Sequence, residues 1–160
     1  MKRSNTVLAI LTAVTLVATY PRVAEAAESH DHHHEAAAAE LHLNQGRKWP
    51  TDDVLRRGMA AMRTELAGQL HDIHKGDLDP DQYAAIAKFI EGEVGTIVSQ
   101  CKLAPEADAM LHIVIADLMG AADTMQGKPP GKPAEGAHRA VAALNNYGKY
   151  FSHPGWLPIR

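Results

Sequence analysis

Apolar residues recur at helical spacing in the first half of the chain. In the segment 51–75 they fall three or four residues apart, as one buried helix face requires: Leu55, Met59, Met62, Leu66, Leu70 and Ile73. The segment 80–101 repeats this spacing through a second set: Tyr83, Ile86, Ile90, Val94, Ile97 and Cys101. Each pattern predicts one amphipathic helix.

Two further helices are predicted in the second half. The segment 105–125, PEADAMLHIVIADLMGAADTM, is the most strongly apolar helical pattern in the chain and needs several partners to cover it. In the segment 134–151, one face is expected to point inward: Ala137, Val141, Leu144, Gly148 and Phe151. The tail beyond this helix is expected to lie over the other helices through Trp156.

Polar and helix-breaking residues mark the ends of these helices. Thr51 is expected to cap the first helix and Gly76 to end it. Asp79 and Gln82 have the spacing of a capping box at the start of the second helix. The run KPPGKP at 128–133 separates the third helix from the fourth, because proline and glycine interrupt a helix.

Short connections between four amphipathic helices place consecutive helices antiparallel. The sequence therefore predicts an all-α fold, an antiparallel up-down-up-down four-helix bundle, over residues 51–160. No strand pattern competes with the helical one at any point.

The first 27 residues have the features of an export signal. Lys2 and Arg3 precede an apolar run, Val7–Ala18, and a small-x-small site allows cleavage after Ala26 or Ala27. The apolar run is well short of the ~20 residues needed to span a bilayer. We therefore expect a periplasmic or secreted protein with no membrane span after cleavage.

Residues 28–50 are a histidine-rich tail and a lead-in to the first helix. The tail, residues 28–43, is expected to be disordered, because such a composition cannot build a core, and in the irregular lead-in Trp49 is expected to pack against the start of the first helix. Four histidines lie close together in the tail: His30, His32, His33 and His34. Neutral imidazole is a common ligand for zinc, copper and nickel, so this tract favours loose metal capture. A solvated linker remains the alternative interpretation.

Charge and cysteine usage narrow the classes of function. The full sequence has a net charge of −3 and no cluster of lysine and arginine, which argues against a nucleic-acid partner. Cys101 is the only cysteine, so no intramolecular disulfide forms. We interpret it as a small buried side chain, with a cross-linked homodimer as the alternative. The sequence contains no catalytic motif, so we expect a non-enzymatic protein.

One candidate metal site lies at the far end of the predicted first helix. His71 and His74 are three residues apart and therefore share a helix face. In the antiparallel order His138 lies at a similar height on the neighbouring helix. Three imidazoles and a water would suit Zn²⁺ or Cu²⁺. The alternative is that all three side chains are simply solvated.

A second candidate is His112, which is flanked by apolar residues in the third helix. Met59 and Met62 lie at about the same height on the first helix. Thioether and imidazole ligands in an interior would suit Cu(I) or a haem iron. In the alternative, His112 lies on the flank of its helix, hydrogen-bonded to Glu93 or a carbonyl, and the methionines are ordinary core residues.

The export signal, size and helix order resemble the cytochrome c′ and cytochrome b562 bundles over about residues 51–151. The sequence departs from both: the last helix, EGAHRAVAALNNYGKYF, has no C-x-x-C-H haem attachment and no late histidine ligand. No functional residue is therefore carried over. The stretches GRKWPTDDVLRRGM and CKLAPEADAMLHIVIADLM also resemble small exported proteins of proteobacteria, a likeness that brings no assigned chemistry.

These observations lead to three hypotheses. The first is an exported protein that binds or buffers copper or zinc, based on ten histidines among 160 residues. The second is a structural or partner-binding bundle in which the histidines are incidental. The third is non-covalent haem binding, which is kept because His112 and Met59 lie at about the same height.

Overall fold

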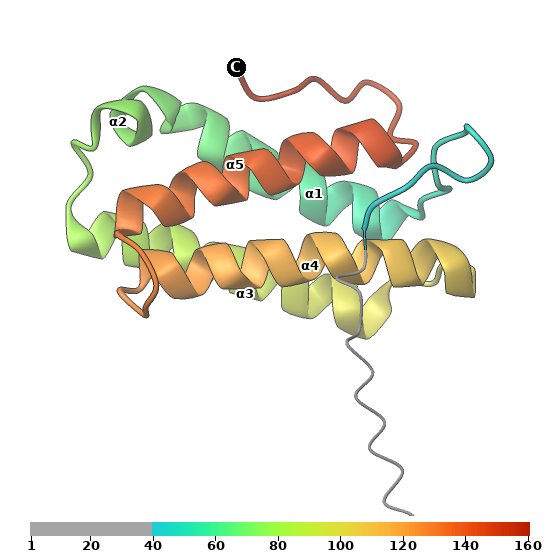
Figure 1. The fold of residues 1–160 in the computed structure, drawn as a ribbon, viewed down its shortest axis with the longest axis horizontal. Helices are drawn as coiled ribbons and strands as arrows, with labels where there is room; N and C mark the ends of the chain where they lie inside the picture. The colour runs from blue at the N-terminus through green and yellow to red at the C-terminus, as the bar shows by residue number, and fades with distance from the viewer. Residues whose placement is uncertain (1–39) are drawn as a thin grey trace, which may run out of the picture. The chain divides into compact units, whose positions relative to one another are not determined.

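The computed structural model describes residues 40–160, and this part of the chain is all-helical (Figure 1). It contains five helices: α1 (Asp53–Gly68), α2 (Leu70–Lys75), α3 (Pro80–Gln100), α4 (Pro105–Met125) and α5 (Pro133–Tyr150). The predicted signal peptide and His30, His32, His33 and His34 lie outside the described residues. Within the described range, no helix combines the length and the apolarity needed to cross a membrane.

The predicted helix over residues 51–75 is two helices, and this corrects the expected count. The break falls at Gln69, which has φ −106° and ψ 6°. Gly68 precedes it, and glycine weakens a helix by ~1 kcal/mol relative to alanine. The predicted end at Gly76 is confirmed: its φ of 70° is left-handed, and its N–H bonds the carbonyl of Ile73 at 3.2 Å.

The cap of α1 is Asp52 and not Thr51. One carboxylate oxygen of Asp52 accepts the Leu55 N–H at 2.8 Å, while the other accepts the Lys102 N–H at 2.7 Å. The Thr51 hydroxyl instead donates to the carbonyl of Ser152 at 2.6 Å. Asp52 therefore both starts α1 and ties it to the connection between α3 and α4.

The other predicted helix ends agree with the structure to within a residue or two. Asp79 and Gln82 form the expected capping box, with both hydrogen bonds 2.8 Å long. Helix α4 spans the predicted range, and α5 starts at Pro133, the last residue of the run at 128–133. Helix breakers are strong local signals, so these boundaries could be predicted from the sequence alone.

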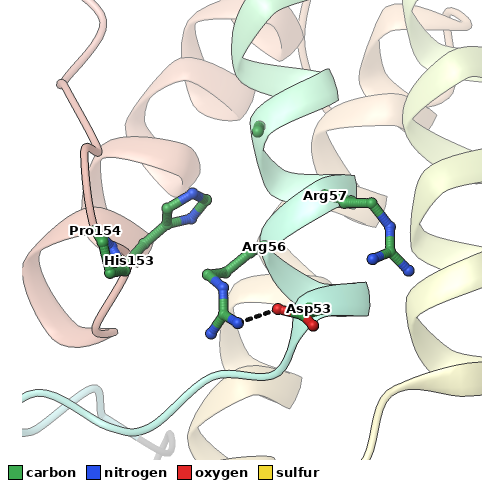
Figure 2. Close-up of a pocket in the computed structure, with 6 residues that line it drawn as sticks. Asp53, Arg56, Arg57, His153 and Pro154 are labelled. Carbon is green, nitrogen blue, oxygen red and sulfur yellow. Dashed lines mark hydrogen bonds and ion pairs between the residues drawn. The ribbon is translucent and has the colours of Figure 1, made fainter.

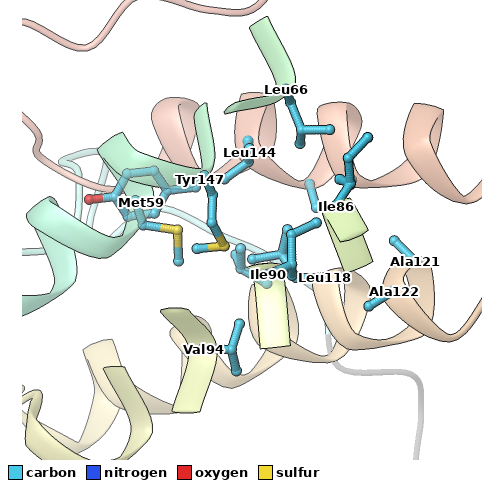
Figure 3. Close-up of a cluster of buried hydrophobic side chains, with 14 of the residues drawn as sticks. Met59, Leu66, Ile86, Ile90, Val94, Leu118, Ala121, Ala122, Leu144 and Tyr147 are labelled. Carbon is cyan, nitrogen blue, oxygen red and sulfur yellow. The ribbon is translucent and has the colours of Figure 1, made fainter. Parts of the chain in front are cut away.

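The predicted apolar faces form one buried core (Figure 3). Met59 and Leu66 of α1 meet Ile86 and Ile90 of α3 and Leu118 of α4, and all five are at most 1% exposed. Helix α3 packs against α1 and α4, and α5 packs against α4, α1 and α2.

The most extensive helix contact is between α4 and α5, and small residues make it close. A Cβ added at Gly136 would lie 2.7 Å from the carbonyl oxygen of Ala121 and 2.8 Å from the backbone nitrogen of Met125. On α5, Ala140 and Ala143 are also buried, whereas Val141, which was expected to point inward, is only half-buried. The backbones of α4 and α5 thus approach more closely than the apolar pattern alone indicates.

Both ends of the described chain are held against α5. The prediction that Trp156 lays the C-terminal segment over the helices is confirmed, since its indole packs on Gly148 and edge-on against Tyr147, with ring centroids 4.9 Å apart. On the other side, the Trp49 N–H donates to the carbonyl of Tyr150 and the Ser152 N–H donates to the carbonyl of Trp49, both at 2.8 Å.

Candidate metal centre

Two histidines from different helices lie together on the surface. The rings of His74, in α2, and His138, in α5, are stacked with their centroids 5.4 Å apart and their planes 12° from parallel. Both residues are exposed. They are two of the three histidines that the sequence analysis places at one height on neighbouring helices.

Helix α2 is positioned so that His74 faces α5. The break at Gln69 turns the chain before α2, and Ile73 then anchors the short helix because its side chain is completely buried. His74 follows Ile73 directly, about 100° further round the helix, and so lies at the edge of the buried contact. On α5, the buried Ala137 places His138 at the same edge.

The third member of the expected set, His71, does not complete the pair. His71 is exposed on α2. Across residues 40–160, the histidine, cysteine, aspartate and glutamate side chains form no group of three or more that could hold a metal ion. The structure therefore supplies two neighbouring imidazoles where the sequence analysis expects three.

The expected pairing of His112 with Met59 or Met62 in the interior is wrong. The side chain of His112 is 63% exposed, whereas both methionines are completely buried. Leu111 and Val114 occupy the buried face of α4, and one residue of offset from Leu111 turns His112 by about 100° towards solvent. The expectation failed because the direction of the His112 side chain around α4 was not the predicted one.

His112 instead takes the place described by the alternative interpretation, on the flank of its helix. Its Nδ1 lies 2.9 Å from the carbonyl oxygen of Asp108 and 3.4 Å from a carboxylate oxygen of the same residue. The buried Met59 and Met62 pack as ordinary core residues. A role for His71 or His112 as a surface metal ligand stays a prediction.

The end of the histidine-bearing segment is held against the helices. The carbonyl of His42 accepts the indole N–H of Trp49 at 2.7 Å, and Leu41 packs against the core. Asn44 and Arg47 pair across a two-residue turn whose central residues, Gln45 and Gly46, have positive φ.

His153, which the sequence analysis missed, lies in a cleft between α1 and the C-terminal segment (Figure 2). The cleft has a volume of about 500 Å³, and Arg56 and His153 face each other across it. Arg56 is already engaged: it pairs with Asp53 and donates to the carbonyl of Thr51 at 2.7 Å. Burial, together with the charge of Arg56, lowers the pKa of His153 below 6.5.

Cys101 lies at the end of α3, where burial and the nearby carboxylate of Asp52 raise its pKa to about 11. It is therefore protonated at neutral pH, which makes it a poor nucleophile and a poor metal ligand. The side chain is only half-buried, so the expectation of a small buried side chain is confirmed in part.

Comparison of the chain with protein-family models, curated proteins and solved structures found no match. The functional argument accordingly depends on the geometry of the residues. Among the histidines that the structure describes, His74 and His138 are the pair that two separate helices bring together.

Proposed function

We propose that the protein is an exported, non-enzymatic, transition-metal-binding protein, with His74 and His138 as its structured site for zinc or copper. The observation that carries the proposal is the contact between these two rings, 5.4 Å apart, across α2 and α5. The histidine tract at 30–34 adds a second, looser set of imidazoles to the same chain.

The spacing of the two rings supports this chemistry. At Zn–N distances of ~2.0–2.1 Å, two imidazoles on one tetrahedral ion have their centroids roughly 5 Å apart. The observed separation is close to this value, although the nearly parallel rings must turn to aim both nitrogens at one ion. Because both side chains are exposed, they are free to rotate about their side-chain bonds.

The proposal includes a finer description of the fold as an antiparallel up-down-up-down four-helix bundle. In this bundle α1 and α2 together take the place of the first helix. Contacts run from α1 to α3, from α3 to α4 and from α4 to α5, and α5 contacts both α1 and α2. Such a closed ring of neighbours is what a four-helix bundle requires. The break between α1 and α2 then brings His74 against α5.

Elemental analysis and zinc titration of the untagged protein test the proposal. After dialysis against a weak chelator, we expect bound zinc or copper. In calorimetric titrations with Zn²⁺, His74→Ala and His138→Ala should each remove the tightest binding step. His71→Ala is the matched control, because it removes an exposed imidazole from the same helix without touching the pair. The tight step should survive in this control.

A variant with serine at positions 30, 32, 33 and 34 distinguishes metal binding by the tail from metal binding by the structured site. This variant should lose weak binding and keep the step that depends on His74 and His138. A protein that stays folded and binds no metal through this pair would contradict the proposal. It would leave the second hypothesis, a structural or partner-binding bundle.

A further inference from the structure

We infer that the site formed by His74 and His138 is half of a metal site, and that a second copy of the chain completes it. This inference rests on the proposed function. Two copies related by a two-fold axis would place four imidazoles around one ion, with each chain contributing an identical pair.

The first argument is the number of ligands. A structural zinc site is nearly always four-coordinate, with each position filled by a protein ligand. Over the part of the chain that the structure describes, no histidine, cysteine, aspartate or glutamate joins the pair to make a group of three. Two imidazoles on one chain are therefore two ligands short of a closed site.

The second argument is symmetry. A two-fold axis gives the same surface to both partners, so any ligand pair that lies on the axis is doubled without the need for a new residue. His74 and His138 meet the geometric requirement, because they are adjacent to one another and both are exposed. A site inside the helical body would be closed to a second copy.

The third argument is the rigidity of the two elements that carry the ligands. Ile73 is completely buried beside His74, and the left-handed Gly76 ends α2 directly after Lys75. Ala137 is completely buried beside His138. Since both backbones are held in place, metal binding orders little more than two side chains, which keeps its entropic cost small.

The location of the two helices favours access by a second copy. In Figure 1, α2 and the N-terminal half of α5 lie at one end of the helical body, whereas the C-terminal segment leaves α5 at the opposite end. Imidazole is neutral when it binds a metal, so bringing two such pairs together does not set like charges against each other.

The test is the molar mass of the full chain in solution as Zn²⁺ is added, measured by light scattering on a size-exclusion column. A Cys101→Ser background excludes disulfide cross-linking. We expect the mass to double at half an equivalent of zinc per chain for the structured site, and to return to the monomer value with EDTA. His74→Ala and His138→Ala should stay monomeric, while His71→Ala and the tail variant with serine at 30, 32, 33 and 34 should still double.

Each other outcome overturns the inference in a recognisable way. Zinc bound through His74 and His138 to a chain that stays monomeric would leave the proposed function intact and exclude the shared site. Doubling that disappears in the tail variant would show that the tail supplies the missing ligands. Absence of any zinc binding that depends on the pair would overturn the inference and the proposed function together.

Discussion

The hydroxyl oxygen of Tyr147 lies 3.0 Å from Nδ1 of His153, which joins the last turn of α5 to the C-terminal segment. Tyr147 is completely buried, and burial raises its pKa well above 10.0 despite the opposing charge of Arg56. The phenol therefore stays protonated and can donate its O–H to Nδ1. A bond in that direction requires the neutral ring with its proton on Nε2, because the roles of the two atoms depend on the tautomer of His153.

The first prediction is that His153 makes the folding free energy depend on pH. Its folded-state pKa is lowered below 6.5, so the unfolded chain binds a proton more readily in the range below that value. The contribution of neutral His153 is thus fully present above about pH 6.5 and is lost as the pH falls through the lowered pKa. Urea unfolding of the wild type at a series of pH values should show this loss.

His153→Asn isolates the effect, because the amide oxygen can still accept from Tyr147 but does not titrate. The variant should lose less stability than the wild type between pH 7 and pH 5. His71→Asn is the control: it removes an exposed histidine from α2 and leaves His153 in place, so the loss of stability towards low pH should be retained. Identical profiles for the wild type and His153→Asn would contradict the prediction.

The second prediction concerns Asn145, which holds the end of the chain in place. Its amide donates to the carbonyl of Ile159 at 3.1 Å and its oxygen accepts the Ile159 N–H at 2.8 Å. Loss of two such bonds costs about 1–2 kcal/mol. Asn145→Ala should therefore destabilise the fold by this amount and speed hydrogen exchange and carboxypeptidase digestion of residues 152–160.

The neighbouring Asn146 provides the comparison. Its side chain accepts from Lys149 at 3.2 Å on the surface, and it lines a cleft with Leu41 and Tyr150. Asn146→Ala should leave digestion of the C-terminal segment unchanged. Equal rates for the two variants would show that the hydrogen bonds to Ile159 do not secure this segment.

Local signals in the sequence were sufficient to predict most of the helices. Pro105 and the proline-rich run at 128–133 define α4 to the residue, and Asp79 with Gln82 defines the start of α3. The break after Gly68 was not predicted, because one glycine costs only ~1 kcal/mol and longer-range packing decides whether the helix continues. The packing of Ile73 against the core favours the turned α2.

The candidate site, like the helices, could be predicted in part from the sequence. Counting residues along antiparallel helices places His74 and His138 at one height, and the structure brings their rings together. The same counting failed for His112, because height does not give the direction of a side chain around its helix. His153 was not predicted at all, since its contact with Tyr147 depends on the path of an irregular segment.

The third prediction is that Gly136 is required for the close approach of α4 and α5. In Gly136→Ala, the new methyl group would lie 2.7 Å from the carbonyl oxygen of Ala121 and would force the two helices apart. Overpacking of this kind costs about 1–3 kcal/mol. Gly92→Ala is the control, because nothing lies within 4 Å of its added Cβ and alanine favours a helix by up to ~1 kcal/mol. In thermal unfolding, the melting temperature should therefore fall in Gly136→Ala and rise in Gly92→Ala relative to the wild type.

The fourth prediction is that the Cys101 thiol reacts slowly. With its pKa raised to about 11 from 9.0, the thiolate population at pH 8 falls by roughly two orders of magnitude relative to an unperturbed thiol. Alkylation by iodoacetamide should be slower by a similar factor in the folded protein than in urea. Asp52→Asn should accelerate it, because the carboxylate that opposes ionisation is gone. Asp53→Asn, which changes the next residue along the chain, should not accelerate alkylation.

The fifth prediction is that zinc stabilises the fold by joining α2 to α5. A ligand that binds only the folded state adds about 2.7 kcal/mol when its concentration is 100 times its dissociation constant. The melting temperature should then rise by several degrees with Zn²⁺ and fall back with EDTA.

The stabilisation should depend on both rings of the pair. Because His74 and His138 are exposed, His138→Ala should change the metal-free melting temperature little, yet it should abolish most of the zinc-dependent rise. His71→Ala should retain the rise, since it leaves both rings of the pair in place. An equal zinc response in His138→Ala and the wild type would place the metal elsewhere in the chain. It would also remove the link between metal binding and the packing of α2.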